Sequence, residues 1–76
     1  MELNDFIENF ASQFDETDVV EFKSDTLFKS IDEWSSLTAL SIIAMVDEEY
    51  NVRIKGDDIH SSNTIEDLFN LVKTRK

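Results

Sequence analysis

The chain has 76 residues, 41% of them hydrophobic, and its 17 acidic and 7 basic residues give a formal charge of −10 at pH 7. A chain of this length closes one modest core, so we expect a single domain over residues 1–76. The lack of cysteine excludes disulfides, thiolate nucleophiles and Cys-ligated zinc, and the negative charge argues against a nucleic-acid partner. No segment resembles a signal peptide or approaches membrane-spanning length, which predicts a cytoplasmic protein without membrane insertion.

Helical spacing of apolar residues recurs in three parts of the chain, which contains no Pro and one Gly. These features predict an all-α fold. The first helix is expected over the apolar positions from Leu3 to Phe14, and the second over Ser36 to Tyr50. A short third helix is expected near residues 57–60, after a stretch in which Val52 and Ile54 alternate with polar residues but have no second strand to pair with.

The last main helix is expected at Ile65 to Val72. Asn63 would open it, with Glu66 in a capping-box-like position. The whole is then a small four-helix bundle, made of three main helices and the short third one.

A connection of about 20 residues lies between the first two helices, and we expect it to be a long loop that packs on the bundle. Ser24 or Asp25 is the expected start of a short helical turn within it. Trp34 is expected to pack at its end. The expected anchors of the loop are all apolar: Val19, Val20, Phe22, Leu27, Phe28 and Ile31.

The segment Asp32-Glu33-Trp34-Ser35-Ser36-Leu37-Thr38-Ala39-Leu40 resembles the attachment segment of acyl carrier proteins, in which a helix begins at an Asp-Ser-Leu motif. The resemblance extends over nearly the whole chain, from the acidic first helix and long loop to the closing helix. It implies that Ser36 receives 4′-phosphopantetheine from coenzyme A through a phosphopantetheinyl transferase. Ser35 stands where the family usually has Asp, and we expect it to cap the second helix.

Physical chemistry supports the same position without the family. A phosphodiester in the first turn of a helix faces free backbone N–H groups and the positive end of the helix dipole. A flexible arm that ends in a thiol would also supply the reactive group that this cysteine-free chain lacks, and would hold acyl groups as thioesters.

The second helix contains no Lys or Arg and ends in Asp47-Glu48-Glu49. In the family, acidic residues at the positions of Asp47 and Glu48 dock onto basic surfaces of acyl-transferring and synthase enzymes. Leu37 is expected to be exposed for the same contact. For Leu40, core and surface are equally expected.

The resemblance implies a monomeric carrier for fatty-acid or polyketide-type synthesis that is not itself an enzyme. A peptidyl carrier, which typically has Gly-Gly before the serine, and a D-alanyl carrier are alternatives. From a different class, the chain could be a non-carrier acidic helical adaptor that binds a basic partner. His60 is the only histidine, and no metal site is expected. Asp57 and Asp58 are expected to be solvated, with partner docking or weak divalent-cation binding as the alternative.

Overall fold

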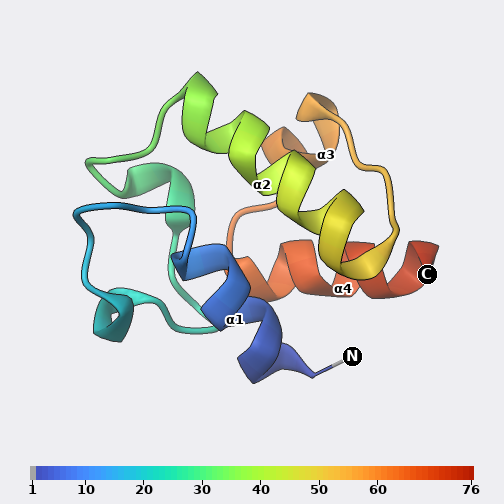
Figure 1. The fold of residues 1–76 in the computed structure, drawn as a ribbon, viewed down its shortest axis with the longest axis horizontal. Helices are drawn as coiled ribbons and strands as arrows, with labels where there is room; N and C mark the ends of the chain where they lie inside the picture. Colours follow the sequence, from blue (N-terminus) through green and yellow to red (C-terminus); the bar gives the residue numbers. More distant parts are fainter. Residues whose placement is uncertain (1) are drawn as a thin grey trace.

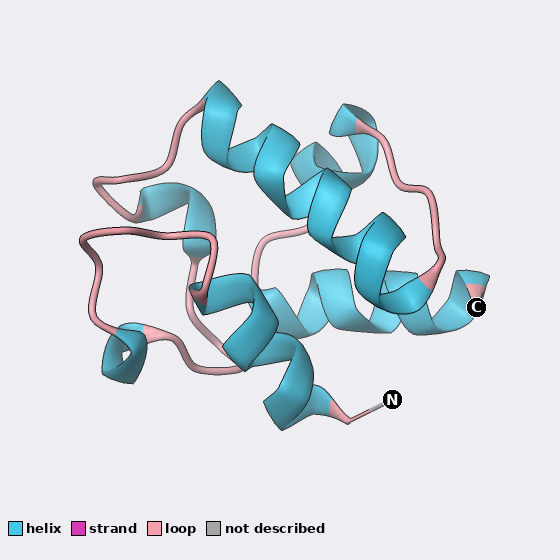
Figure 2. Ribbon diagram, viewed as in Figure 1, coloured by secondary structure: helices cyan, strands magenta, loops and turns pink. Residues whose placement is uncertain are grey.

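Helices make up most of residues 2–76, the part of the chain that a computed structural model describes. The four α-helices are α1 (Leu3–Ala11), α2 (Ser36–Tyr50), α3 (Gly56–Ser61) and α4 (Ile65–Arg75) (Figure 1). Two 3₁₀ turns, η1 (Val19–Glu21) and η2 (Phe28–Ser30), lie in the loop between α1 and α2. Figure 2 shows helices and loops but no strand over these residues. The prediction of an all-α fold is therefore confirmed.

The first helix is shorter than its apolar spacing predicts. α1 ends at Ala11, whereas the prediction ran to Phe14. Past this point the N–H of Phe14 donates to the Ala11 carbonyl at 3.0 Å, an i→i−3 bond that tightens a helix end. Phe14 nevertheless stays in the core, with 6% of its surface exposed. The spacing identified the buried face but not the end of the helix.

Aromatic rings form the centre of the core and join α1 to its neighbours. The Phe6 ring lies 5.6 Å from the Tyr50 ring of α2 and 5.5 Å from the Phe69 ring of α4, measured between centroids. Phe10 packs 5.4 Å from Phe28, on the loop side. Such tilted and edge-on pairs add to the stabilisation that burial alone provides. Figure 1 shows the result, with α1 and α4 beneath α2.

The long loop is anchored by aromatic residues rather than by all six of the expected apolar ones. Phe22 and Phe28 are buried, with 5% and 0% exposed, and Ile31 packs partly against the core. The other three expected anchors are exposed and that prediction is wrong for them: Val19, Val20 and Leu27. The aromatic rings already fill the space under the loop, so these smaller side chains point outward.

Trp34 packs as expected at the end of the loop. Its ring is half-buried and lies 5.0 Å from the Phe28 ring and 6.3 Å from the Phe14 ring. No helical segment starts at Ser24 or Asp25 as expected: these residues lie in a single turn closed by the Thr26 N–H, which donates to the Lys23 carbonyl at 3.1 Å, and the two 3₁₀ turns begin at residues 19 and 28.

The short third helix is present and spans Gly56–Ser61. The segment before it has no regular secondary structure, and Val52 and Ile54 are both buried in the core, which explains their alternation without a strand. The opening of α4 is one residue later than predicted. Thr64, not Asn63, is the cap, and Asp67 completes the capping box in place of Glu66.

Two side-chain contacts fix that register. The Thr64 hydroxyl oxygen accepts from the Asp67 N–H at 3.1 Å, while the Asp67 carboxylate accepts from the Thr64 N–H at 3.1 Å. The N–H of Glu66 donates at 3.0 Å to the Ser24 carbonyl of the long loop. A tertiary contact thus satisfies one of the free N–H groups at the start of α4. The local sequence pattern does not indicate this contact.

Candidate functional site

The two adjacent serines stand at the start of α2, and the backbone assigns them different places. Ser35 is the N-cap, with φ −155° and ψ 177°, and Ser36 is the first helical residue. This confirms both the predicted bounds of the helix and the capping position of Ser35. Both side chains are on the surface.

The hydroxyl of Ser35 is engaged on both its donor and its acceptor side. It accepts from the Thr38 N–H at 3.3 Å and lies 3.1 Å from the Thr38 hydroxyl oxygen. That hydroxyl donates to the Glu33 carbonyl at 3.0 Å. A threonine hydroxyl has one proton to give, so Ser35 must be the donor in the pair with Thr38.

Ser36 differs from Ser35 in this respect. Within residues 2–76 its hydroxyl makes no hydrogen bond. Activating it as a nucleophile therefore breaks no existing contact, whereas using Ser35 would disrupt the cap of α2.

The N-terminus of α2 also keeps backbone donors free. The Thr38 N–H is satisfied by Ser35, and the Ala39 N–H donates to the Ser35 carbonyl at 3.0 Å. Across the described chain, the N–H groups of Ser36 and Leu37 have no acceptor. The first turn of α2 contains no acidic residue, unlike the first turns of α1, α3 and α4. This helix end can therefore stabilise an anion on Ser36.

Glu33 holds the segment that leads into α2. Its carboxylate accepts from the backbone N–H of Asp15 at 2.7 Å, of Glu16 at 3.1 Å and of Thr17 at 2.9 Å, and from the Thr17 hydroxyl at 2.8 Å. Desolvation works to raise the pKa of Glu33, but the hydrogen bonds from Thr17 and from the three N–H groups outweigh it, so this pKa lies below its ordinary value. We call this set of contacts the Glu33 clamp. It ties the residues before Ser36 to the loop that follows α1.

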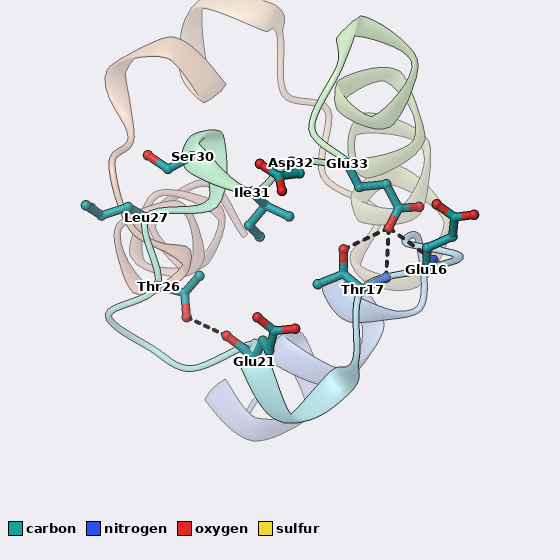
Figure 3. Close-up of a pocket in the computed structure, with 9 residues that line it drawn as sticks. All are labelled: Glu16, Thr17, Glu21, Thr26, Leu27, Ser30, Ile31, Asp32 and Glu33. Atoms are coloured by element: carbon teal, nitrogen blue, oxygen red, sulfur yellow. Dashed lines mark hydrogen bonds between the residues drawn. The ribbon is translucent and has the colours of Figure 1, made fainter.

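A groove of about 590 Å³ lies beside the clamp. Figure 3 shows Ile31 and Glu33 on one side of it and the Glu21 backbone, which accepts from the Thr26 hydroxyl at 3.1 Å, on another. Ser36 is not among its lining residues. The groove therefore neighbours the candidate attachment point but does not contain it.

The remaining predicted site residues lie on one exposed face of α2, starting at Ser36. Leu37 has 76% of its surface exposed and Leu40 has 61%, which settles the location of Leu40 as surface. Asp47 and Glu48 are exposed further along the helix. At about 1.5 Å per residue the face extends roughly 18 Å from Ser36 to Glu48. The opposite side packs into the core through Ile42, Met45 and Val46. We refer to Leu37, Leu40, Asp47 and Glu48 as the α2 face.

Asp47 and Glu48, at the acidic end of this face, make no ion pair within residues 2–76, although the Lys76 ammonium donates to the Tyr50 carbonyl at the same end of α2 at 3.0 Å. Their charges are thus available to a partner. The helix ends at Asn51 in the left-handed conformation.

Asp58 corrects a prediction, because it is not simply solvated. It is half-buried, and its two carboxylate oxygens accept from the Arg75 guanidinium at 2.6 and 2.7 Å. The hydrogen bond from Arg75, followed by that from the Lys55 N–H, lowers the pKa of Asp58. Asp57 is exposed as expected. Over residues 2–76 no three His, Asp or Glu side chains gather closely enough to hold a metal ion.

Sequence reasoning missed the Glu33 clamp. Glu33 lies in the quoted segment, but its partners are 16 to 18 residues earlier in the chain. A carboxylate before a helix gives no sign of such distant donors. Three of the four donors are backbone N–H groups, which every residue except proline carries, so the Thr17 hydroxyl was the only side-chain signal.

No family model and no curated protein matches this chain. None of the described helices has the length and apolar character needed to cross a bilayer.

Proposed function

We propose that the protein is a carrier whose Ser36 is modified with 4′-phosphopantetheine and that it carries acyl groups for other enzymes without being an enzyme itself. One observation carries this proposal: an exposed Ser36 hydroxyl, free of hydrogen bonds within residues 2–76, stands at the first position of a helix whose first two N–H groups, those of Ser36 and Leu37, are unpaired in the described chain. When bound, the arm would supply a thiol, which the chain does not contain.

Three residues have distinct parts in this proposal. Ser36 provides the oxygen that becomes part of the phosphodiester. Ser35 keeps the helix start in place through its bonds to Thr38. Glu33 fixes the approach of the chain to the helix. The free N–H groups of the first turn would then face the phosphodiester charge.

The α2 face is the proposed recognition surface. Leu37 and Leu40 offer apolar contact close to the attachment point, and Asp47 and Glu48 offer negative charge at the far end. The proposed partners are a phosphopantetheinyl transferase and acyl-transferring or synthase enzymes with basic docking surfaces. We further propose a monomeric, cytoplasmic carrier with the four-helix arrangement of acyl carrier proteins, serving fatty-acid or polyketide-type synthesis.

The test is to incubate the protein with coenzyme A, Mg²⁺ and a broad-specificity phosphopantetheinyl transferase and to measure its intact mass. We expect the mass of one phosphopantetheine to be added. Ser36→Ala should abolish the addition, and Ser35→Ala should slow it without abolishing it. If the addition persists in Ser36→Ala and is lost in Ser35→Ala, the arm is attached to Ser35 and the assignment to Ser36 is wrong.

A second candidate function rests on the same face. Leu37 and Leu40 are exposed beside acidic residues, which also suits a non-carrier adaptor that binds a basic partner directly. The intact-mass experiment separates the two, because an adaptor would gain no mass under any of these conditions.

A further inference from the structure

The turn η1 presents two valines to solvent in a fixed orientation. Val19 has 55% and Val20 has 70% of its surface exposed. The residue that follows η1, Phe22, is anchored in the core, because it is 5% exposed and its ring lies 4.8 Å from that of Phe14. The N–H of Phe22 donates to the Val19 carbonyl at 3.1 Å. The outward direction of the valines is therefore set by a packed turn and not by a loose loop.

A groove of about 460 Å³ lies between η1 and α1. Half of its lining is apolar: Leu3, Ile7, Val19 and Phe22. Leu3 and Ile7 are only partly buried, and both lie on the outer part of the core. This groove and Val20 together form what we call the α1–η1 surface. Isolated apolar side chains are ordinary on a protein surface, but a concave apolar lining marks a place where a partner can bind.

The charge around this surface has one dominant sign. Residues 2–22 contain seven acidic residues and no Lys or Arg. Asp18 and Glu21 flank the two valines, and Glu8 lines the groove. Lys23 is the only basic residue in the lining. A complementary partner therefore needs apolar side chains on one side and Lys or Arg at their margin.

We propose that the α1–η1 surface docks a basic amphipathic helix of a partner protein. The apolar stripe of that helix would occupy the groove, as in other helix-in-groove complexes, and its Lys or Arg residues would approach Glu8, Asp18 and Glu21. The surface is separate from the α2 face, since η1 is at the lower left of Figure 1, whereas α2 starts at the top and runs down to the right. A protein held here keeps the α2 face and Ser36 accessible. The inference does not depend on the modification of Ser36.

The test uses a synthetic peptide made only of Leu and Lys, with Leu at the i, i+3, i+4, i+7 positions of a helix. Its binding to the ¹⁵N-labelled protein is followed by amide chemical shifts, which report both affinity and location. A peptide of the same composition in scrambled order is the control for charge alone. The protein variants are Val19→Ser/Val20→Ser and, as a matched pair on the other face, Leu37→Ser/Leu40→Ser.

We expect the patterned peptide to shift amides of α1 and residues 18–23, and to bind more tightly than the scrambled one. Val19→Ser/Val20→Ser should weaken this binding at least about tenfold, which corresponds to about 1.4 kcal/mol, and Leu37→Ser/Leu40→Ser should leave it unchanged. Glu8→Lys/Glu21→Lys, which does not alter the valines, should weaken it as well. Absence of binding, shifts confined to α2, or equal affinity for both peptides would overturn the proposal.

Discussion

At the scale of single residues, the distinction between Ser35 and Ser36 predicts opposite effects on stability and on modification. Ser35→Ala removes the cap of α2 and the partner of the Thr38 hydroxyl, so we expect the free energy of unfolding to fall by about 1 kcal/mol. Ser36→Ala removes no side-chain hydrogen bond within the described chain and should change the free energy of unfolding by less than about 0.5 kcal/mol. Urea denaturation measures both. Ser35→Asp is the control, because an aspartate caps equally well but cannot donate to the Thr38 hydroxyl oxygen.

Equal losses in the two alanine variants would contradict this account of the helix start. So would a loss in Ser35→Asp as large as that in Ser35→Ala. The first result would mean that Ser36 also stabilises the helix start, and the second that Ser35 contributes through its bond to the Thr38 hydroxyl rather than through its cap.

The Glu33 clamp predicts a pH dependence. The pKa of Glu33 is lowered in the folded protein, so its stabilising contribution is complete above the ordinary value of 4.5 and is lost as the pH falls through the lower folded value. Glu33→Gln should be less stable than the wild-type protein at pH 7, because a neutral amide cannot accept from all the donors that the carboxylate holds. The difference in unfolding free energy should shrink as the pH falls below 4.5.

Glu16→Gln is the matched control, because the Glu16 side chain makes no hydrogen bond within residues 2–76. We expect its stability to follow that of the wild-type protein at every pH. A constant difference between Glu33→Gln and wild type from pH 7 to acid conditions would show that the ionised carboxylate is not the stabilising group.

At the scale of elements, the end of α2 depends on Asn51 in the left-handed region, with φ 57° and ψ 38°. Its N–H donates to the Asp47 carbonyl at 3.0 Å. Glycine adopts this conformation without a Cβ clash, so Asn51→Gly should keep or slightly raise stability. Asn51→Ala should lower it by about 1 kcal/mol. Urea denaturation of the pair tests this, and an alanine variant at least as stable as the glycine variant would contradict it.

The short helix α3 is held to the end of the chain by one bidentate ion pair. Arg75 has 43% of its side chain exposed and Asp58 has 14%, so solvent screens the pair and we expect it to contribute little to global stability. Its effect should be local instead. Arg75→Gln should speed amide hydrogen exchange in α3 while leaving that of α1 unchanged.

Lys73→Gln provides the comparison on the same helix, because Lys73 makes no ion pair within residues 2–76. It should leave exchange in α3 as it is. The same acceleration in both variants would show that general charge loss, not the pair with Asp58, controls α3.

At the scale of the whole molecule, the charge is largely unpaired. The formal charge is −10, and the described residues contain one ion pair. Self-repulsion should therefore oppose folding, and salt should relieve it, since the Debye length falls to about 10 Å at 0.1 M. We expect the melting temperature to rise with added NaCl. A melting temperature that is insensitive to NaCl would rule out repulsion as a limit on stability.

The same charge distribution predicts how partners are recognised. Asp47→Lys/Glu48→Lys should slow association of the modified protein with a partner enzyme. The association rate should also depend less on the salt concentration than it does for the wild-type protein. Asp15→Lys/Asp25→Lys changes the net charge equally but lies outside the α2 face. Stopped-flow association at low and high salt compares them. Equal losses would indicate a long-range field rather than docking on α2.

How far the sequence predicts the structure depends on the range of the contacts. The bounds of α2 were predicted correctly because its cap, its apolar stripe and its end are all local. The Glu33 clamp was not predicted, since it joins residues 16 to 18 positions apart. The predicted cap of α4 is one residue too early. At this helix start the Glu66 N–H donates to the Ser24 carbonyl of the loop, a contact that the local sequence does not indicate. The prediction of Val19, Val20 and Leu27 as loop anchors is wrong, because composition does not show which apolar side chains of a loop find space against the core.

The central claim is that Ser36 carries the arm, and the most direct measurement is to locate the modification in the unaltered protein. After treatment with coenzyme A and a phosphopantetheinyl transferase, the chain is digested and its peptides are fragmented in a mass spectrometer. Cleavage between Ser35 and Ser36 separates the two candidates. We predict the added mass on the fragment that begins with Ser36. Added mass on Ser35, or no added mass on either serine, would contradict the account.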